Sequence, residues 1–158
     1  MQMDKLDKRI LQELQRNGAI TNLELAEKIG LSPSPCARRV KQLAHSGIIK
    51  QQVTLLDASK LELKLIALIQ ISMDRHTPDR FEIFEDKVRS FPEVTECLLI
   101  TGQSADYQLK VFVPDMEYYQ EFLLNKITKI EGVTDVHSSF ILREVLSTTE
   151  LPLTHIQS

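Results

Sequence analysis

The sequence predicts an α+β protein in two parts: an N-terminal three-helix domain containing a helix-turn-helix, and a C-terminal βαββαβ domain. Apolar residues recur at helical spacing through the first third of the chain. After Leu65 the pattern changes to continuous or alternating apolar runs, separated by two further helical segments. Charge divides in the same way: residues 1–52 contain 9 Lys and Arg against 5 Asp and Glu, whereas residues 53–158 contain 10 against 17. We therefore expect two modules, of which the basic first one is suited to bind phosphate.

The composition of the 158 residues is that of a globular protein, with 42% hydrophobic and 26% charged residues. No apolar run reaches the roughly 18 residues that span a bilayer, and the first residues do not resemble a signal peptide. Cys36 and Cys97 stand far apart in the sequence, which favours a reducing, cytoplasmic location over a disulfide scaffold. The four histidines lack metal-ligand spacing, and we find no catalytic motif. We therefore expect no metal, no cofactor, no membrane partner and no enzymatic activity.

The first helix is expected over Asp4–Asn17, and Gly18 ends it. Its apolar stripe has four-residue spacing and is expected to form core: Leu6, Ile10 and Leu14. This helix is expected to pack across the helix-turn-helix and complete a three-helix domain.

A second helix is expected to begin at Asn22, because Thr21 and Glu24 have the spacing of a capping box. Gly30 ends this helix, since a glycine takes the left-handed C-terminal turn without a Cβ clash. The apolar face of the helix consists of Leu25, Ala26 and Ile29.

A third helix follows, with Ser32 as its N-cap and Pro33 at the first position, and it closes at Gly47. The expected inward face consists of Cys36, Val40 and Leu43. Such a pair of helices is typical of a helix-turn-helix whose second helix enters the DNA major groove. Arg and Gln side chains can read bases there, and all the polar residues can bond phosphates. The candidate DNA-binding residues, several projecting outward from this helix, are Thr21, Asn22, Ser32, Ser34, Arg38, Arg39, Lys41 and Gln42. The alternative is an ordinary helical hairpin with a solvated basic face.

The stretch from Gly47 to Leu63 is interpreted as a strand plus linker, in which Val53 to Leu56 favours an extended strand. The expected domain limits are residues 1–52 for the DNA-binding domain, 53–63 for the linker strand and 64–158 for the second domain.

The second domain is expected to contain four strands and two helices in the order βαββαβ, which is the ferredoxin-like order of elements. The expected ranges are strand 65–73, helix 78–91, strand 94–100, strand 106–113, a helix from 114 to 132 and strand 133–145. The tail after Glu150 is expected to be partly disordered.

Both helices of such a domain cover one face of its sheet, so the second face needs another cover. The strands carry too many apolar residues for one face, among them Ile69, Ile71, Leu98, Ile100, Phe112, Phe140 and Leu142. An apolar exposed sheet is typical of an interface, so we expect a homodimer in which two sheets stack.

The chain resembles the leucine-responsive regulatory protein (Lrp)/AsnC family of transcription regulators along nearly its whole length. The residues that carry the resemblance are Asp4-Lys5-Leu6-Asp7, Ile10-Leu11, Leu31-Ser32-Pro33, Arg39-Val40, Leu43, Gly47-Ile48-Ile49 and Val133 after Gly132. The resemblance implies dimers formed through the C-terminal domain that assemble further, commonly to octamers. It also implies binding to double-stranded DNA at several spaced sites, a free amino acid bound between dimers, and no catalysis.

The loop Gly102–Tyr107 is one residue longer than the Gly-x-x-Asp-Tyr segment common in that family. Gly102 permits a tight turn, after which the amides of Gln103, Ser104 and Ala105 are placed to cradle an α-carboxylate. Asp106 is placed to pair with an α-ammonium group. Three residues of the last strand are expected to face the same effector site from a neighbouring subunit: Thr134, His137 and Ser138. The alternative is a plain hairpin loop.

We therefore predict a sequence-specific transcription regulator whose assembly or DNA affinity responds to an amino acid, with leucine or methionine as the expected effector. A second interpretation is an architectural protein that compacts DNA with little sequence preference. A third is a ferredoxin-like enzyme or metabolite-binding module with an incidental helical front, for which we find no catalytic constellation.

Overall fold

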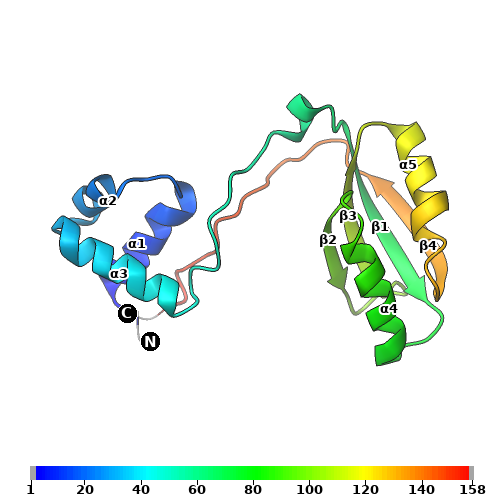
Figure 1. The fold of residues 1–158 in the computed structure, drawn as a ribbon, viewed down its shortest axis with the longest axis horizontal. Coiled ribbons are helices and arrows are strands. Elements are labelled where there is room, and N and C mark those ends of the chain that lie inside the picture. Colours follow the sequence, from blue (N-terminus) through cyan, green and yellow to red (C-terminus); the bar gives the residue numbers. More distant parts are fainter. Residues whose placement is uncertain (1–2, 157–158) are drawn as a thin grey trace. The chain divides into compact units, whose positions relative to one another are not determined.

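The computed structural model describes residues 3–156 (Figure 1). The chain forms two compact units. The first comprises the N-terminal residues as far as Leu55 together with the C-terminal segment from Leu146, and the second comprises Leu56–Val145. The chain therefore passes between the units twice. No helix of residues 3–156 is both long and apolar enough to cross a bilayer.

The N-terminal unit contains helices α1 (Lys5–Arg16), α2 (Asn22–Ile29) and α3 (Pro33–His45). The expected capping box at Thr21 is present, and Asp4 and Asp7 form a second one at the start of α1. The prediction that Ser32 caps α3 is right for the backbone but wrong for the side chain, which makes no capping hydrogen bond. The three helices enclose one core, formed by Ile10, Leu11, Leu25, Ala26, Ile29, Cys36 and Leu43.

The linker contains no strand, so the prediction of a strand near Val53 to Leu56 is wrong. A β-strand requires a neighbouring strand to pair with, and this exposed segment pairs with none in the described residues. A short 3₁₀ turn, η1 (Ala58–Leu61), precedes the sheet instead.

The second unit has the predicted βαββαβ order. Its elements are β1 (Leu65–Met73), α4 (Pro78–Arg89), β2 (Val94–Leu99), β3 (Tyr107–Val113), α5 (Met116–Phe122) with the π-turn η2 (Leu123–Ile127), and β4 (Val133–Phe140). The strands pair antiparallel in the order β2-β3-β1-β4, which confirms the ferredoxin-like fold (Figure 1). The last strand ends at Phe140 rather than Val145, because its pairing with β1 runs out there.

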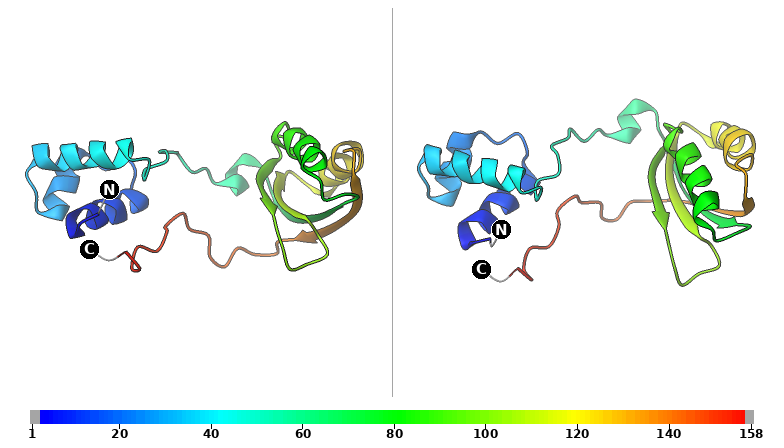
Figure 2. Two further views of the ribbon diagram at one scale, coloured as in Figure 1. Left: turned by 90° about the horizontal axis from the view of Figure 1, so that it is seen from below. Right: turned by 60° about the horizontal axis from the view of Figure 1, so that its bottom comes forward.

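Helices α4 and α5 lie on one face of the sheet, as the views in Figures 1 and 2 agree. Ile69 and Ile71 of β1 point to that face and are fully buried, so these two members of the predicted apolar set do not contribute to the open face. Phe140 lies opposite Ala67 and shares the helix-covered face. The open face is mixed in character. Its apolar residues include Ile66, Leu68, Leu98 and Phe112, and its polar ones include Gln70, Glu96, Gln108 and Lys110.

Candidate nucleic-acid interface and effector site

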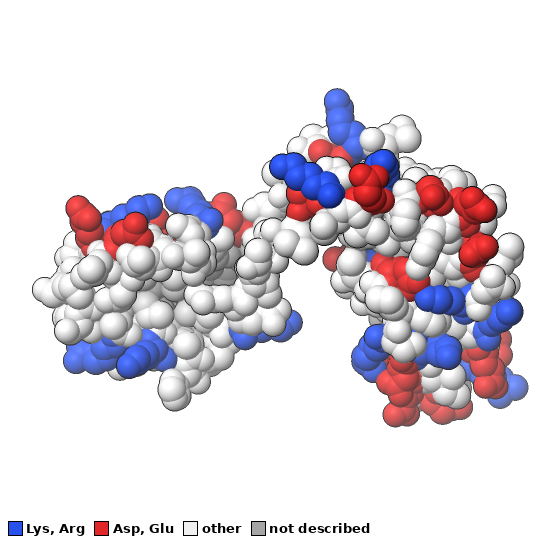
Figure 3. All heavy atoms as spheres, turned by 45° about the horizontal axis from the view of Figure 1, so that its top comes forward, with Lys and Arg blue, Asp and Glu red and all other residues white. Residues whose placement is uncertain are grey.

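Helix α3 presents an unengaged polar side. Ser34, Arg38, Lys41 and Gln42 are exposed, and within residues 3–156 their side chains make no hydrogen bond. Figure 3 shows one group of Lys and Arg side chains on the N-terminal unit without acidic neighbours in that view, whereas elsewhere on this unit and on the second unit both signs of charge lie side by side. Free guanidinium, ammonium and amide groups on one helix can reach phosphates and base edges.

The two predicted DNA-binding residues at the start of α2 are already engaged within the protein, whereas the one before α3 is not. Thr21 Oγ1 accepts a hydrogen bond from the amide of Glu24 at 3.3 Å and donates to its carboxylate at 2.8 Å. Asn22 Nδ2 donates to the carbonyl of Pro33 at 2.9 Å and so ties the start of α2 to the start of α3. Ser32 is exposed and keeps its hydroxyl free for another partner.

Arg39 was predicted to project outward from α3, and this prediction is wrong. Its Nη1 lies 2.7 Å from Asp4 Oδ2 and 2.8 Å from Asp7 Oδ1, so α3 is fastened to the start of α1. Hydrogen bonds to Asp7 and then Asp4 raise the pKa of the Arg39 guanidinium. The amide of Asp7, followed by Arg39, lowers the pKa of the Asp4 carboxyl against the opposing effect of burial. Helical spacing alone did not show that two aspartates face this arginine.

A further fastening residue was not predicted. The Arg9 guanidinium donates to the carbonyls of Lys28 at 2.8 Å and Ile29 at 3.1 Å. These carbonyls belong to the last turn of α2 and have no partner within their helix. Arg9 therefore holds α2 against α1, and no sequence motif marks it.

The predicted effector loop is tied to β1. Gln70 Nε2 donates to Gln103 Oε1 at 2.8 Å, and the Ser72 hydroxyl donates to the carbonyl of Ser104 at 3.3 Å. In the described part of the chain, the amides of Gln103 and Ser104 form no hydrogen bond and stay available to an anion. Ala105, in contrast, is buried.

Two of the predicted β4 residues lie beside the same part of β1. The Thr134 hydroxyl donates to the carbonyl of Ser72 at 3.1 Å, and His137 lies opposite Gln70 in the β1–β4 register. The loop and β4 thus both lie beside Gln70 and Ser72 of β1 within one chain, and the contribution expected from a neighbouring subunit stays a prediction. Gln70 and Ser72, which connect them, were missed because the apolar run of β1 gave no functional signal.

Ser138 does not belong to this group. It lies opposite Ile69, which places it on the helix-covered face, and its hydroxyl contacts the hydroxyl of Tyr119. The prediction that it shares a site with His137 is wrong, because neighbouring residues of a strand point to opposite faces.

Asp106 has internal partners that were not predicted. Its Oδ2 accepts a hydrogen bond from the amide of Met73 at 2.7 Å, and its Oδ1 lies 2.7 Å from Nε2 of the exposed His76. The carboxylate therefore anchors the loop to the end of β1, and it is not the free partner for an ammonium group that we expected.

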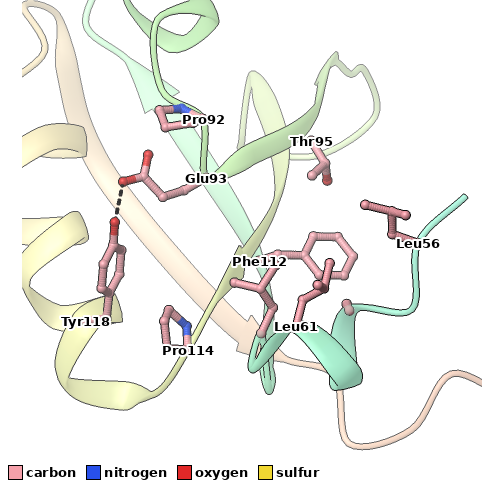
Figure 4. A pocket seen from close by; sticks show the side chains of 10 residues that line it. Leu56, Leu61, Pro92, Glu93, Thr95, Phe112, Pro114 and Tyr118 are labelled. Atoms are coloured by element: carbon pink, nitrogen blue, oxygen red, sulfur yellow. Dashed lines mark hydrogen bonds between the residues drawn. The ribbon is translucent and has the colours of Figure 1, made fainter. Parts of the chain in front are cut away.

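A separate hollow of about 460 Å³ lies where η1, β2, β3 and the start of α5 meet (Figure 4). It is largely apolar, and its lining residues include Leu56, Leu61, Pro92, Glu93, Phe112 and Tyr118. Glu93 Oε1 accepts hydrogen bonds from Tyr118 at 2.9 Å and Lys126 at 2.6 Å. Burial opposes ionisation of Glu93, but the hydrogen bonds from Lys126, the backbone and Tyr118 prevail and lower its pKa. No predicted effector residue lines this hollow. Residues 3–156 also contain no group of His, Cys, Asp and Glu suited to a metal ion.

Comparisons with known proteins agree with both halves of the structure. The family model described as "Winged helix-turn-helix DNA-binding" matches residues 3–50, and the one described as "Lrp/AsnC ligand binding domain" matches residues 66–151. The leucine-responsive regulatory protein of Escherichia coli K12 is 38% identical over 149 residues, which cover 94% of this chain and 90% of that protein.

Solved structures of transcriptional regulators are also similar to nearly the whole of this chain. A transcriptional regulator of Neisseria meningitidis, solved in complex with L-methionine, is 45% identical, with a TM-score of 0.94 over 98% of this chain and 99% of the other. An AsnC family transcriptional regulator of Agrobacterium tumefaciens is 38% identical, with a TM-score of 0.92 over 98% of this chain and 100% of the other.

Proposed function

Because the chain belongs to the Lrp/AsnC family of transcription regulators, with a helix-turn-helix and an amino-acid-binding domain, we propose that methionine or leucine controls its binding to operator DNA. The observation that carries the DNA-binding part is the free polar side of α3 at Arg38, Lys41 and Gln42. Ser34 and Ser32 at the start of the helix add hydroxyls, whereas Thr21, Asn22 and Arg39 hold the helices in place. The protein acts in the cytoplasm as a homodimer that assembles further.

The proposed effector site is the polar end of the sheet, where Gln103 and Ser104 contact β1 beside its pairing with β4. Free loop amides suit a carboxylate, and the side chains of Gln70 and His137 supply further polar contacts. The Neisseria regulator, solved with L-methionine, supports methionine as the first effector to test. Leucine follows from the name of the Escherichia coli relative.

Calorimetry of the full-length protein against each of the twenty amino acids tests the effector, with light scattering to measure the oligomer. We expect methionine or leucine to bind and to change DNA affinity or assembly. The variant Gln103→Ala is expected to weaken that binding. Gln51→Ala serves as its control, because Gln51 is an exposed glutamine outside the effector-binding domain. If none of the twenty amino acids bound, the proposed effector site would be refuted.

Fluorescence anisotropy with labelled duplexes tests the DNA-binding part. Affinity is expected to fall steeply with salt, because phosphate contacts release counterions. A regulator binds its own promoter far more tightly than random DNA of equal length, whereas an architectural protein binds both alike. Equal affinity for the two duplexes would therefore replace the proposed function with the architectural one.

A further inference from the structure

The C-terminal segment 150–156 lies against α1, although it follows the last strand of the other unit. The Gln15 side chain forms a pair of hydrogen bonds with the backbone of Leu151: Oε1 accepts from its amide at 2.6 Å, and Nε2 donates to its carbonyl at 3.2 Å. Arg16 Nε lies 2.7 Å from Glu150 Oε1. Lys8 Nζ lies 3.4 Å from the carbonyl of Ile156.

One apolar contact completes this docking. Leu153 is half-buried and packs against the core cluster of the helix-turn-helix domain, which includes Cys36 and Leu43 of α3. The surface of α1 thus recognises an extended peptide by its backbone, one acidic side chain and one leucine. Recognition of an extended backbone with a pocket for alternate side chains is a common mode of peptide binding.

The path of the chain connects this segment to the effector site. β4 carries Thr134 and His137, and after Phe140 the chain runs without helix or strand to the docked residues. At the other end of the same helix, Asp4 and Asp7 hold Arg39 of α3. The C-terminal segment is therefore a second covalent connection between the unit that contains β4 and α1, in addition to the linker at 53–63.

We propose that α1 is a docking surface for the chain's own C-terminal segment, and that this contact transmits effector binding to the DNA-binding helix. The transmission rests on the proposed function, whereas the docking does not. Release of the segment leaves effector binding intact but uncouples it from DNA affinity.

The variant Gln15→Ala tests this proposal, because it removes both hydrogen bonds to Leu151 and leaves the buried core unchanged. Gln12→Ala is the matched control: it is the same substitution on the same helix, and in the described residues the Gln12 side chain makes no hydrogen bond. Hydrogen exchange of the full-length protein measures docking. We expect exchange at residues 150–156 to rise at least roughly fivefold in Gln15→Ala and to stay unchanged in Gln12→Ala, since the loss of even one of the two hydrogen bonds corresponds to about that factor.

Transmission is measured by anisotropy with promoter DNA, with and without methionine, beside calorimetry of methionine binding. In Gln15→Ala we expect unchanged methionine affinity and at least a halved effect of methionine on DNA affinity. A full methionine effect in a variant whose segment exchanges freely overturns the transmission, and unchanged exchange in Gln15→Ala overturns the docking. Failure of the proposed function itself appears in the unmodified protein, as absence of DNA or methionine binding.

Discussion

Substitution of Arg39 by alanine is expected to destabilise the N-terminal unit more than it affects DNA contacts. The Arg39 side chain is 25% exposed, and its two partners differ: the Asp7 side chain is 10% exposed and the Asp4 side chain 51%. A hydrogen bond to a charged group contributes about 1.5–3 kcal/mol, whereas a well-solvated ion pair contributes about 0–1 kcal/mol. We therefore assign about 2 kcal/mol to the contact with Asp7 and little to the contact with Asp4.

Urea unfolding followed by helical circular dichroism measures this loss, and a double-mutant cycle of Arg39→Ala with Asp7→Ala isolates the contact. The expected coupling energy is about 2 kcal/mol. Arg38→Ala is the matched control on the same helix. Because Arg38 has no internal partner in the described residues, this substitution is expected to change stability by less than about 0.5 kcal/mol.

DNA affinity is expected to respond in the opposite way from stability: Arg38→Ala weakens it more than Arg39→Ala does. Arg38→Ala is expected to weaken promoter binding by about 1–3 kcal/mol if its guanidinium reads a base. If Arg39→Ala left the urea midpoint unchanged and weakened DNA binding as much as Arg38→Ala does, the assignment of Arg39 as a fastening residue would be refuted. Arg39 would then be a direct DNA contact, as the sequence had suggested.

Two further predictions concern single positions of the fold. Gly132→Ala is expected to lower stability by about 1–3 kcal/mol, because Gly132 has φ of 92° and a Cβ there would lie 2.5 Å from Cδ of Arg80. Gly18→Ala is its control, since that Cβ meets no atom closer than 3.9 Å, and thermal unfolding compares the two. Hydrogen bonds from Asp7 and Thr21 lower the pKa values of the capping carboxyls of Asp4 and Glu24. Because these pKa values are lower in the folded protein, the capping stability is present at neutral pH and is lost as pH falls below about 4. An acid titration of helical signal checks this, and Asp4→Asn is expected to flatten it.

The sequence predicted the fold well because its signals are local. Capping residues, glycines and apolar spacing act over a few residues, and they placed α1, α2 and α3 within one or two positions of their observed ends. The order of the later strands and helices then restricted the topology to the ferredoxin-like one. The linker strand was wrong because β propensity at Val53 to Leu56 has no effect without a partner strand.

Side-chain partners could not be predicted in the same way, since they depend on contacts between residues distant in sequence. Arg39 meets Asp4 and Asp7 across more than thirty residues, and nothing in the α3 pattern indicates them. Asp106 was likewise assigned to a ligand, whereas the structure gives it to the amide of Met73. The orientation of Ser138 could have been predicted from the sequence, because His137 and Ser138 are neighbours in one strand and must face opposite sides of the sheet.

The expectation that copies of the chain associate now depends on only part of the predicted set, together with residues that were not in it. Ile69 and Ile71 are buried under α4 and α5, so they provide no surface for a partner. Of the predicted residues, Leu98 and Phe112 lie on the open face of the sheet and Leu142 is exposed. The segments between the units expose further large apolar side chains that were not predicted: Val53, Leu55, Leu56, Val145 and Leu146. Leu142 is 98% exposed. Scattered apolar residues on a surface need no explanation, but a concentration on both connecting segments and one sheet face is costly for a solitary chain. Association that covers these residues also constrains the connecting segments. In the proposed homodimer, assembly and the transmission of the effector signal therefore depend on the same stretches of chain.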